Sequence, residues 1–235
     1  MAKQHESLNK PQFEVLLACK ELPGKAQRAI ATRAGISLGS ANKALKDLRE
    51  KNFLDQAGCI TEQGIQALGP YRVESAVILA AGTASRLAPL SFERPKAMFE
   101  VRGEVLIERL IRQLRQAGVN DITVVVGYMK EEFFYLEDEF GVRIVVNPQY
   151  AERGNYASLF SARKYLGNTY VCCSDEYYTE NVFSPYVYRP YLSTVSGANV
   201  ERKYVVSCDK AGRITKVARE DASGAVRYYA GPAYL

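Results

Sequence analysis

Tryptophan is missing from this 235-residue chain, and His5 is its single histidine. One histidine so close to the N-terminus leaves Ser-His, Cys-His and histidine-metal mechanisms without their central residue, so these classes are excluded. The five cysteines are odd in number and show no CxxC spacing, which argues against a zinc site and against a disulfide framework. We therefore expect a protein of the reducing cytoplasm.

Long apolar runs are also missing. The longest stretches, such as Ala76–Ala81 and Ile122–Val126, are far shorter than the roughly 20 residues that cross a bilayer. We therefore expect no membrane span. The N-terminus also lacks a signal-peptide pattern. The net charge of +5 is too small for a dedicated nucleic-acid-binding protein and suits an anionic small substrate, while 47% hydrophobic residues suffice for a buried core.

Between residues 9 and 68 the apolar residues recur at helical spacing, which predicts a small helical domain over residues 1–72. Asn9 is a suitable N-cap for a first helix, a second spans about 26–34, and Ser37 caps a third. A short β-hairpin and a last helix over 62–68 follow. This order of elements is that of a winged helix-turn-helix domain.

The third helix of this domain is expected to carry polar and basic side chains away from its apolar stripe. Five of them could contact DNA phosphates or base edges: Ser40, Asn42, Lys43, Lys46 and Arg49. Asp47 and Glu50 weaken this face. A domain used for protein contact or homodimerisation explains the same pattern, so both interpretations stay open.

A different rhythm begins near residue 75 and predicts an α/β domain over residues 73–235. Short, β-rich apolar runs suit strands that are covered on both faces, and they alternate with helical patterns. The strand-like runs are 77–79, 122–126, 143–146 and 170–173, and the helical ones are 106–117, 131–139 and 156–165. Such alternation is typical of a mostly parallel sheet.

The first of these strands leads directly into a loop of small residues. The segment reads Leu79-Ala80-Ala81-Gly82-Thr83-Ala84-Ser85-Arg86, and Lys96 follows ten positions later. Small side chains leave backbone N–H groups free to wrap nucleotide phosphates, and Arg86 and Lys96 would supply positive charge. A tight turn with solvated charges is the alternative, and it explains the combined spacing less well.

This segment resembles the signature LAxGxGxRLxPLxxxxPK of sugar-phosphate nucleotidyltransferases, and it is most similar to the bacterial choline-phosphate cytidylyltransferase branch. Residues 101–109, 124–128 and 167–170 extend the resemblance, which covers about residues 76–181. Ala84 stands where the family has the second glycine of GxGxR. The resemblance implies a Rossmann-like nucleotidyltransferase domain.

The resemblance also implies the reaction: transfer of CMP from CTP to phosphocholine or a similar phosphorylated small alcohol, with release of pyrophosphate. Because a phosphate is itself the nucleophile, no general base is needed, and catalysis consists of alignment and charge neutralisation. The implied catalytic residues are Arg86, Lys96 and Asp175, with Asp175 binding Mg²⁺. A turn aspartate at the end of a strand is the alternative for Asp175.

The resemblance places the nucleotide against the small-residue loop and two later segments. Asn155 and Ser158 match a segment that helps to bind the base, although helix capping is an alternative role for Asn155. The implied nucleotide-binding residues are Leu79, Ala80, Ala81, Gly82, Thr83, Ala84, Ser85, Arg86, Lys96, Tyr128, Asn155 and Ser158.

Aromatic faces and carboxylates are the groups that can hold a quaternary ammonium, and the chain has 16 tyrosines. The implied substrate-binding residues are Tyr177, Tyr191, Glu201 and Tyr204, with Tyr178 and Tyr188 as further candidates. Ordinary packing at strand faces is the alternative for each tyrosine.

Relatives continue past the strand that resembles residues 228–235 and carry a second acidic metal ligand there. We therefore expect this chain to lack the C-terminal part of the nucleotidyltransferase domain, since Glu220 and Asp221 are weak substitutes. Two other functions stay open: a DNA-binding regulator with a nucleotide-sensing domain, and a sugar-1-phosphate nucleotidylyltransferase.

Overall fold

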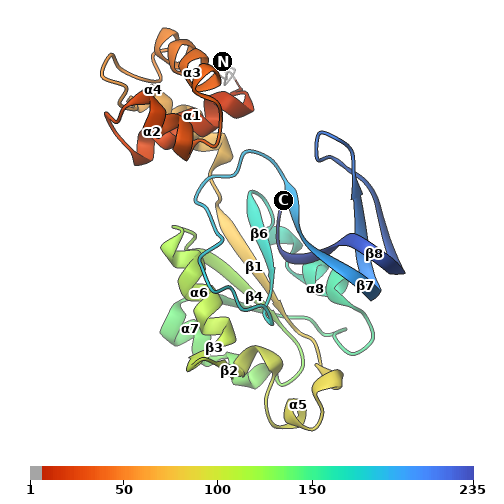
Figure 1. Cartoon of the computed structure of the whole chain (residues 1–235). Helices are drawn as coiled ribbons and strands as arrows, with labels where there is room; N and C mark the ends of the chain where they lie inside the picture. Colours follow the sequence, from red (N-terminus) through yellow and green to blue (C-terminus); the bar gives the residue numbers. More distant parts are fainter. Residues whose placement is uncertain (1–6) are drawn as a thin grey trace. The chain divides into compact units, whose positions relative to one another are not determined.

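The computed structural model describes residues 7–235, except for the side chains of residue 86 and of residues 198–203 and 220–225. It divides the chain into two compact units, Met1–Arg72 and Val73–Leu235 (Figure 1). Each unit has its own buried apolar core.

The N-terminal unit contains α1 (Lys10–Glu21), α2 (Gln27–Arg33), α3 (Leu38–Glu50) and α4 (Glu62–Leu68). Asn9 forms a capping box with Gln12: the Gln12 backbone N–H donates to Asn9 Oδ1 at 3.0 Å, and the Asn9 N–H donates to Gln12 Oε1 at 3.2 Å. Ser37 caps α3 through the backbone N–H of Ser40. The predicted helices are therefore confirmed.

Two features of this unit differ from expectation. The predicted hairpin is reduced to one antiparallel bridge, Leu54 to Ile60. Ser40, Asn42, Lys43 and Lys46 are exposed, but Arg49 is half-buried, and its Nε makes no hydrogen bond within the described residues. Arg49 points toward the turn at residues 57–58, because a Cβ on Gly58 would lie 3.6 Å from Arg49 Nη2. Arg49 is therefore less accessible than the other four residues predicted to contact DNA.

The C-terminal unit is built on a six-stranded sheet with the order β5-β4-β1-β6-β8-β7. β5, β4, β1 and β6 pair in parallel, and β8 runs antiparallel to β6 and to β7. The strands are β1 (Ser75–Ala80), β4 (Asp121–Val126), β5 (Arg143–Val146), β6 (Thr169–Cys173), β7 (Tyr191–Cys208) and β8 (Ile214–Tyr234). The expected α/β fold with a mostly parallel sheet is confirmed.

Helices cover both faces of the parallel strands (Figure 1). Alternate residues of β1 divide between two layers: Ile78 joins the core under α6 (Leu106–Gln116) and α7 (Tyr135–Phe140), and Val77 packs on the side of α8 (Asn155–Ser161). Burial on both faces explains why these strands are almost uniformly apolar. The remaining short elements are α5 (Leu90–Glu93) and the two-stranded β2 (Glu100–Val101) and β3 (Glu104–Val105).

Two predicted helices are interrupted. The helix expected over 131–139 divides into a 3₁₀ turn, Lys130–Phe133, and α7. The helix expected over 156–165 divides into α8 and a second 3₁₀ turn, Arg163–Tyr165. Among residues 7–235, the helices are too short or too polar for any to cross a bilayer.

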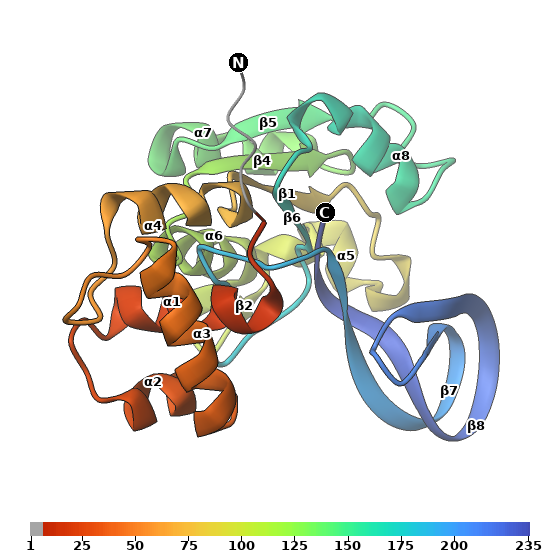
Figure 2. The same ribbon diagram turned by 90° about the horizontal axis from the view of Figure 1, so that it is seen from above.

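β7 and β8 form a long hairpin that projects from the other strands (Figures 1 and 2). β8 pairs with β6 only through Tyr234 and Ala233, while β7 follows it over most of its length. The sequence pattern predicted only the last part of β8, because most of this ribbon lacks the uniform apolar run of a doubly covered strand.

Gly127 follows β4 and packs against the small-residue loop. A Cβ at this position would lie 2.5 Å from Tyr150 Cβ and 3.0 Å from the Ala81 carbonyl oxygen, which also accepts the Tyr128 N–H at 3.3 Å. We expect Gly127→Ala to lower the free energy of unfolding by about 1–3 kcal/mol, because buried backbone must move to admit the methyl group. Urea denaturation followed by circular dichroism measures the change. Gly154→Ala is the matched control, since a Cβ there meets nothing within 4 Å; equal losses in both variants would contradict the crowding at Gly127.

Candidate nucleotide-binding site

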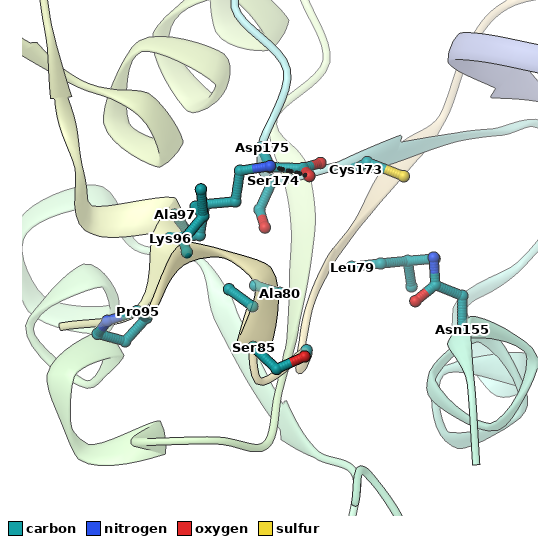
Figure 3. A pocket seen from close by; sticks show the side chains of 13 residues that line it. Leu79, Ala80, Ser85, Pro95, Lys96, Ala97, Asn155, Cys173, Ser174 and Asp175 are labelled. Carbon is teal, nitrogen blue, oxygen red and sulfur yellow. Dashed lines mark hydrogen bonds and ion pairs between the residues drawn. The ribbon is translucent and has the colours of Figure 1, made fainter. Parts of the chain in front are cut away.

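A cleft of about 520 Å³ opens at the carboxyl ends of β1 and β6 (Figure 3). It lies where the chain order reverses in the sheet, because β1 pairs with β4 on one side and with β6 on the other. Ligands of open α/β sheets bind at such switch points. Eight residues predicted to bind nucleotide or metal line it: Leu79, Ala80, Gly82, Ala84, Ser85, Lys96, Asn155 and Asp175.

The small-residue loop leaves β1 and turns sharply at Ala84. Ala84 has φ +49° and ψ +35°, the left-handed region, immediately before the 3₁₀ turn Ser85–Leu87. Glycine adopts this conformation without a steric penalty, whereas an L-residue is disfavoured there. The geometry therefore explains why the resembled signature has glycine at this position.

A charged pair closes one wall of the cleft. Lys96 Nζ lies 2.7 Å from Asp175 Oδ2, although the two residues are 79 positions apart in the sequence (Figure 3). Their side chains are 37% and 43% exposed, so both groups remain accessible to a ligand. The structure thus brings together two of the three predicted catalytic residues. The third, Arg86, has its side chain outside the described residues.

Asn155 faces this pair from the opposite wall (Figure 3). It is the first residue of α8, and its N-cap is Gly154 without any side-chain hydrogen bond, so the alternative capping role for Asn155 is wrong. Ser158 does not reach the cleft: it is 3% exposed, and its Oγ accepts a hydrogen bond from Asn147 Nδ2 at 3.0 Å. Ser158 therefore anchors α8 to the buried Asn147 that follows β5.

Three further predicted nucleotide-binding residues are not among those that line the cleft: Ala81, Thr83 and Tyr128. Ala81 is buried, and its carbonyl oxygen accepts the Tyr128 backbone N–H. This bond ties the loop to the end of β4. Ala81 and the backbone of Tyr128 therefore contribute to the shape of the loop.

Cys173 lines the cleft but is a poor nucleophile. Burial, followed by the neighbouring charges of Glu176 and Asp175, raises the pKa of its thiol to about 12. At neutral pH the thiol is protonated, and only the thiolate reacts readily. Burial therefore disfavours Cys173 as a nucleophile.

A second pocket of about 440 Å³ lies beside the segment that follows β6. Two of the predicted substrate-binding residues, Tyr177 and Tyr191, line it together with Tyr178. Tyr204 lies on the hairpin instead, 51% exposed and with the Arg219 guanidinium 6.0 Å from its ring centroid. Tyr188 is also not among the lining residues. The side chains of Glu201, Glu220 and Asp221 are outside the described residues.

Arg109 of α6 holds this segment and was not recognised from the sequence. Its guanidinium donates to the carbonyl oxygens of Tyr178 at 2.9 Å and Thr179 at 3.2 Å, and pairs with Glu104. It also lies 4.6 Å from the centroid of the Tyr177 ring. An arginine on an amphipathic helix is usually solvated, so only its place in the matched segment 101–109 could have indicated this role.

Glu176 was also missed. It follows Asp175 directly and lines the second pocket, so consecutive residues serve the two cavities. One carboxylate oxygen accepts the Gly231 backbone N–H at 2.7 Å, and the other accepts the Tyr178 hydroxyl. Burial and this hydrogen bond raise the pKa of Tyr178, so the phenol stays neutral. The alternation of side chains past a strand end could have indicated it.

The residues of the cleft fit a magnesium ion that is held by one carboxylate together with the phosphates of a substrate. Among the described side chains there is no group of three or more metal-ligating residues, and Asp175 is the carboxylate among them that lines the cleft. Mg²⁺ is commonly held by one or two carboxylates, with water and substrate phosphates completing its shell. Asp175 is thus compatible with a metal that arrives together with a nucleotide.

Comparison with known proteins shows similarity to nucleotidyltransferases. Residues 76–176 match the MobA-like NTP transferase domain. The choline-phosphate cytidylyltransferase of Streptococcus pneumoniae is 40% identical over 151 residues, which are 59% of this chain and 66% of that protein. The 2-aminoethylphosphonate cytidylyltransferase of Lancefieldella rimae is 37% identical over 152 residues, 62% of this chain and 61% of that protein.

A solved structure supports the same relationship. That of CTP:phosphocholine cytidylyltransferase from Streptococcus pneumoniae is 35% identical, has a TM-score of 0.65, and is matched over 70% of this chain and 71% of its own. The chain spans 61–66% of the length of three curated relatives. The chain therefore belongs to the nucleotidyltransferase family, through a choline-phosphate cytidylyltransferase-like NTP transferase domain.

Proposed function

We propose that the C-terminal unit transfers CMP from CTP to the phosphate of phosphocholine or of a similar small phosphorylated alcohol. The observation that carries this proposal is the Lys96–Asp175 pair beside the small-residue loop, at the switch point of the sheet. The family supports it, since the similar proteins named above are cytidylyltransferases.

The chemistry is a displacement at phosphorus. An oxygen of the acceptor phosphate attacks the α-phosphorus of CTP, the bond from that phosphorus to the bridging oxygen of the β-phosphate breaks, and its electron pair leaves with pyrophosphate. The acceptor phosphate is already anionic, so the chain needs no general base. Preorganised positive charge and alignment are what the enzyme must supply.

Lys96 provides that charge from one wall of the cleft. Its ammonium is paired with Asp175, and a bound triphosphate would offer it a second anionic partner. Asn155 presents a donor and an acceptor from the opposite wall, which suits the edge of a pyrimidine. Mg²⁺ held by Asp175 would neutralise phosphate charge and orient the triphosphate.

The second pocket is the proposed site for the rest of the acceptor. Asp175 lines the cleft and the next residue, Glu176, lines the second pocket, so both cavities border the segment that follows β6. Tyr177, Tyr178 and Tyr191 give this pocket an aromatic lining.

Pyrophosphate release tests the proposed function. The chain is mixed with each of the four common ribonucleoside triphosphates, Mg²⁺, and either phosphorylated amino alcohols or sugar 1-phosphates. Release with CTP and a phosphorylated amino alcohol supports the proposal. Release only with a sugar 1-phosphate would replace it by a sugar-1-phosphate nucleotidylyltransferase. Nucleotide binding without any release would favour the nucleotide-sensing regulator.

Removing either charge of the pair should slow the reaction while the fold persists. We expect Lys96→Gln and Asp175→Asn each to lower kcat by on the order of 10²-fold, as for loss of one preorganised charged group. Lys210→Gln removes an exposed lysine outside the cleft and should keep the wild-type rate. Steady-state pyrophosphate assays measure this; wild-type kcat in both cleft variants would show that the pair is a surface ion pair.

A cytoplasmic location belongs to the same proposal. All five cysteines are free thiols, as a reducing compartment keeps them. Two of them, Cys172 and Cys173, follow one another in β6 and are not paired with each other. The nucleoside triphosphate that the proposed reaction uses is also found in that compartment.

For the N-terminal unit we propose a winged helix-turn-helix that contacts DNA through α3. The exposed residues Ser40, Asn42, Lys43 and Lys46 support it, and Arg49 of the same helix is half-buried. Lys46 Nζ also lies 3.8 Å from Glu50 Oε1. Both side chains are exposed, so a DNA phosphate could replace the Glu50 carboxylate as the partner of Lys46. Protein contact or homodimerisation is the competing use of this face.

The salt dependence of DNA binding tests this proposal. If Lys43 and Lys46 each neutralise one phosphate, the log–log slope of affinity against salt should be about −2 for the full chain and duplex DNA. Lys43→Ala combined with Lys46→Ala should flatten that slope by roughly two, and Lys164→Ala combined with Lys210→Ala should not. Fluorescence anisotropy at several salt concentrations gives the slope. Absence of binding to any duplex at low salt would leave protein contact as the role of the unit.

A further inference from the structure

The second pocket contains a charged group whose surroundings indicate which acceptor it selects. Glu176 lines this pocket beside Tyr177, Tyr178 and Tyr191. It is the one acidic residue among the described residues that line it. A cationic end group of the acceptor would therefore meet this carboxylate.

The Glu176 carboxylate is anchored on both oxygens. The Gly231 N–H donates to Oε1 at 2.7 Å, and the Tyr178 hydroxyl donates to Oε2. A carboxylate has about four acceptor positions, so two remain for a ligand. Anchoring by two elements, the 176–178 segment and β8, fixes the carboxylate before a substrate arrives, which reduces the entropy lost on binding.

The tyrosine rings of the pocket are already engaged with protein groups. The Arg109 guanidinium lies 4.6 Å from the Tyr177 ring centroid. Tyr191 stacks on Tyr234 at 6.3 Å with an interplanar angle of 27°. Tyr178 contacts Phe183 edge to face, with ring centroids 5.8 Å apart.

These contacts limit what the pocket offers to a quaternary ammonium. Such a cation cannot donate a hydrogen bond and is held by several open aromatic faces. Tyr177 has one face beside a guanidinium, and Tyr191 has one face covered by another ring. An aromatic cage is therefore only partly available.

The pocket also offers hydrogen-bond acceptors. Ser193 and Thr194 of β7 line the pocket with Glu176, and their hydroxyl oxygens can accept. A primary ammonium has three N–H donors and a compact charge, which this arrangement of a carboxylate and hydroxyls can satisfy.

We propose that Glu176 is a specificity-determining residue that selects acceptors ending in a primary ammonium, such as phosphoethanolamine or an aminoalkylphosphonate, over those ending in a quaternary ammonium. This inference rests on the proposed function, because it assigns the second pocket to the acceptor of CMP. It narrows the acceptor class to phosphate monoesters and phosphonates that carry a free primary amine.

The test is acceptor selectivity, measured as kcat/KM for pyrophosphate release from CTP. We expect wild-type protein to prefer phosphoethanolamine over phosphocholine by about 10-fold or more, the effect of a hydrogen bond to a charged group. Glu176→Gln should lower this preference by about 10-fold, chiefly through the KM of phosphoethanolamine, and leave the KM of CTP unchanged. Glu180→Gln, which removes an exposed carboxylate four residues away, should keep the wild-type selectivity.

Each other outcome has a distinct meaning. Equal use of phosphoethanolamine and phosphocholine, a preference for phosphocholine, or unchanged selectivity in Glu176→Gln would overturn the inference while leaving the proposed function intact. Release only with sugar 1-phosphates would overturn it as well. No release with any acceptor would contradict the proposed function and the inference together. Thermal melting of Glu176→Gln shows that a lost preference does not come from unfolding.

Discussion

The parallel pairing of β1 with β6 decides where chemistry can take place in this chain. Leu79 stands opposite Cys173 in that ladder, so the loop after β1 and the Ser174-Asp175 segment after β6 leave the sheet at the same edge. Neither segment alone makes a site: the loop supplies backbone, and β6 supplies the carboxylate. Lys96 then reaches back to Asp175 and closes the wall between them.

The segment after β6 extends this logic to the second cavity. Asp175 serves the cleft and Glu176 serves the neighbouring pocket, one residue apart. Arg109 fixes the following carbonyl oxygens, and Gly231 of β8 fixes Glu176. The geometry of the second pocket therefore depends on contacts from α6 and from β8, which lie far from the signature loop in the sequence.

Much of this was predictable from the sequence where the signal is local. Strands β1, β4 and β6 are almost uniformly apolar because both of their faces are covered, and the caps Asn9 and Ser37 define helix starts. The cleft followed from the small-residue loop and Asp175. Properties set by distant contacts did not follow: the burial of Ser158 against Asn147, the turning of Arg49 toward Gly58, and the anchoring of Glu176 by Gly231 each join residues whose spacing carries no periodic pattern.

The central claim is that the cleft at the ends of β1 and β6 binds a nucleotide through Lys96 and Asp175. Thermal melting of the full chain with CTP and Mg²⁺ tests it most directly, because a ligand that binds only the folded state stabilises it by about 2.7 kcal/mol at a concentration of 100 Kd. The account predicts a higher Tm with CTP than with the other three triphosphates, and a smaller shift in Lys96→Gln and Asp175→Asn. An unchanged Tm with every triphosphate, or equal shifts in wild type and both variants, would contradict it.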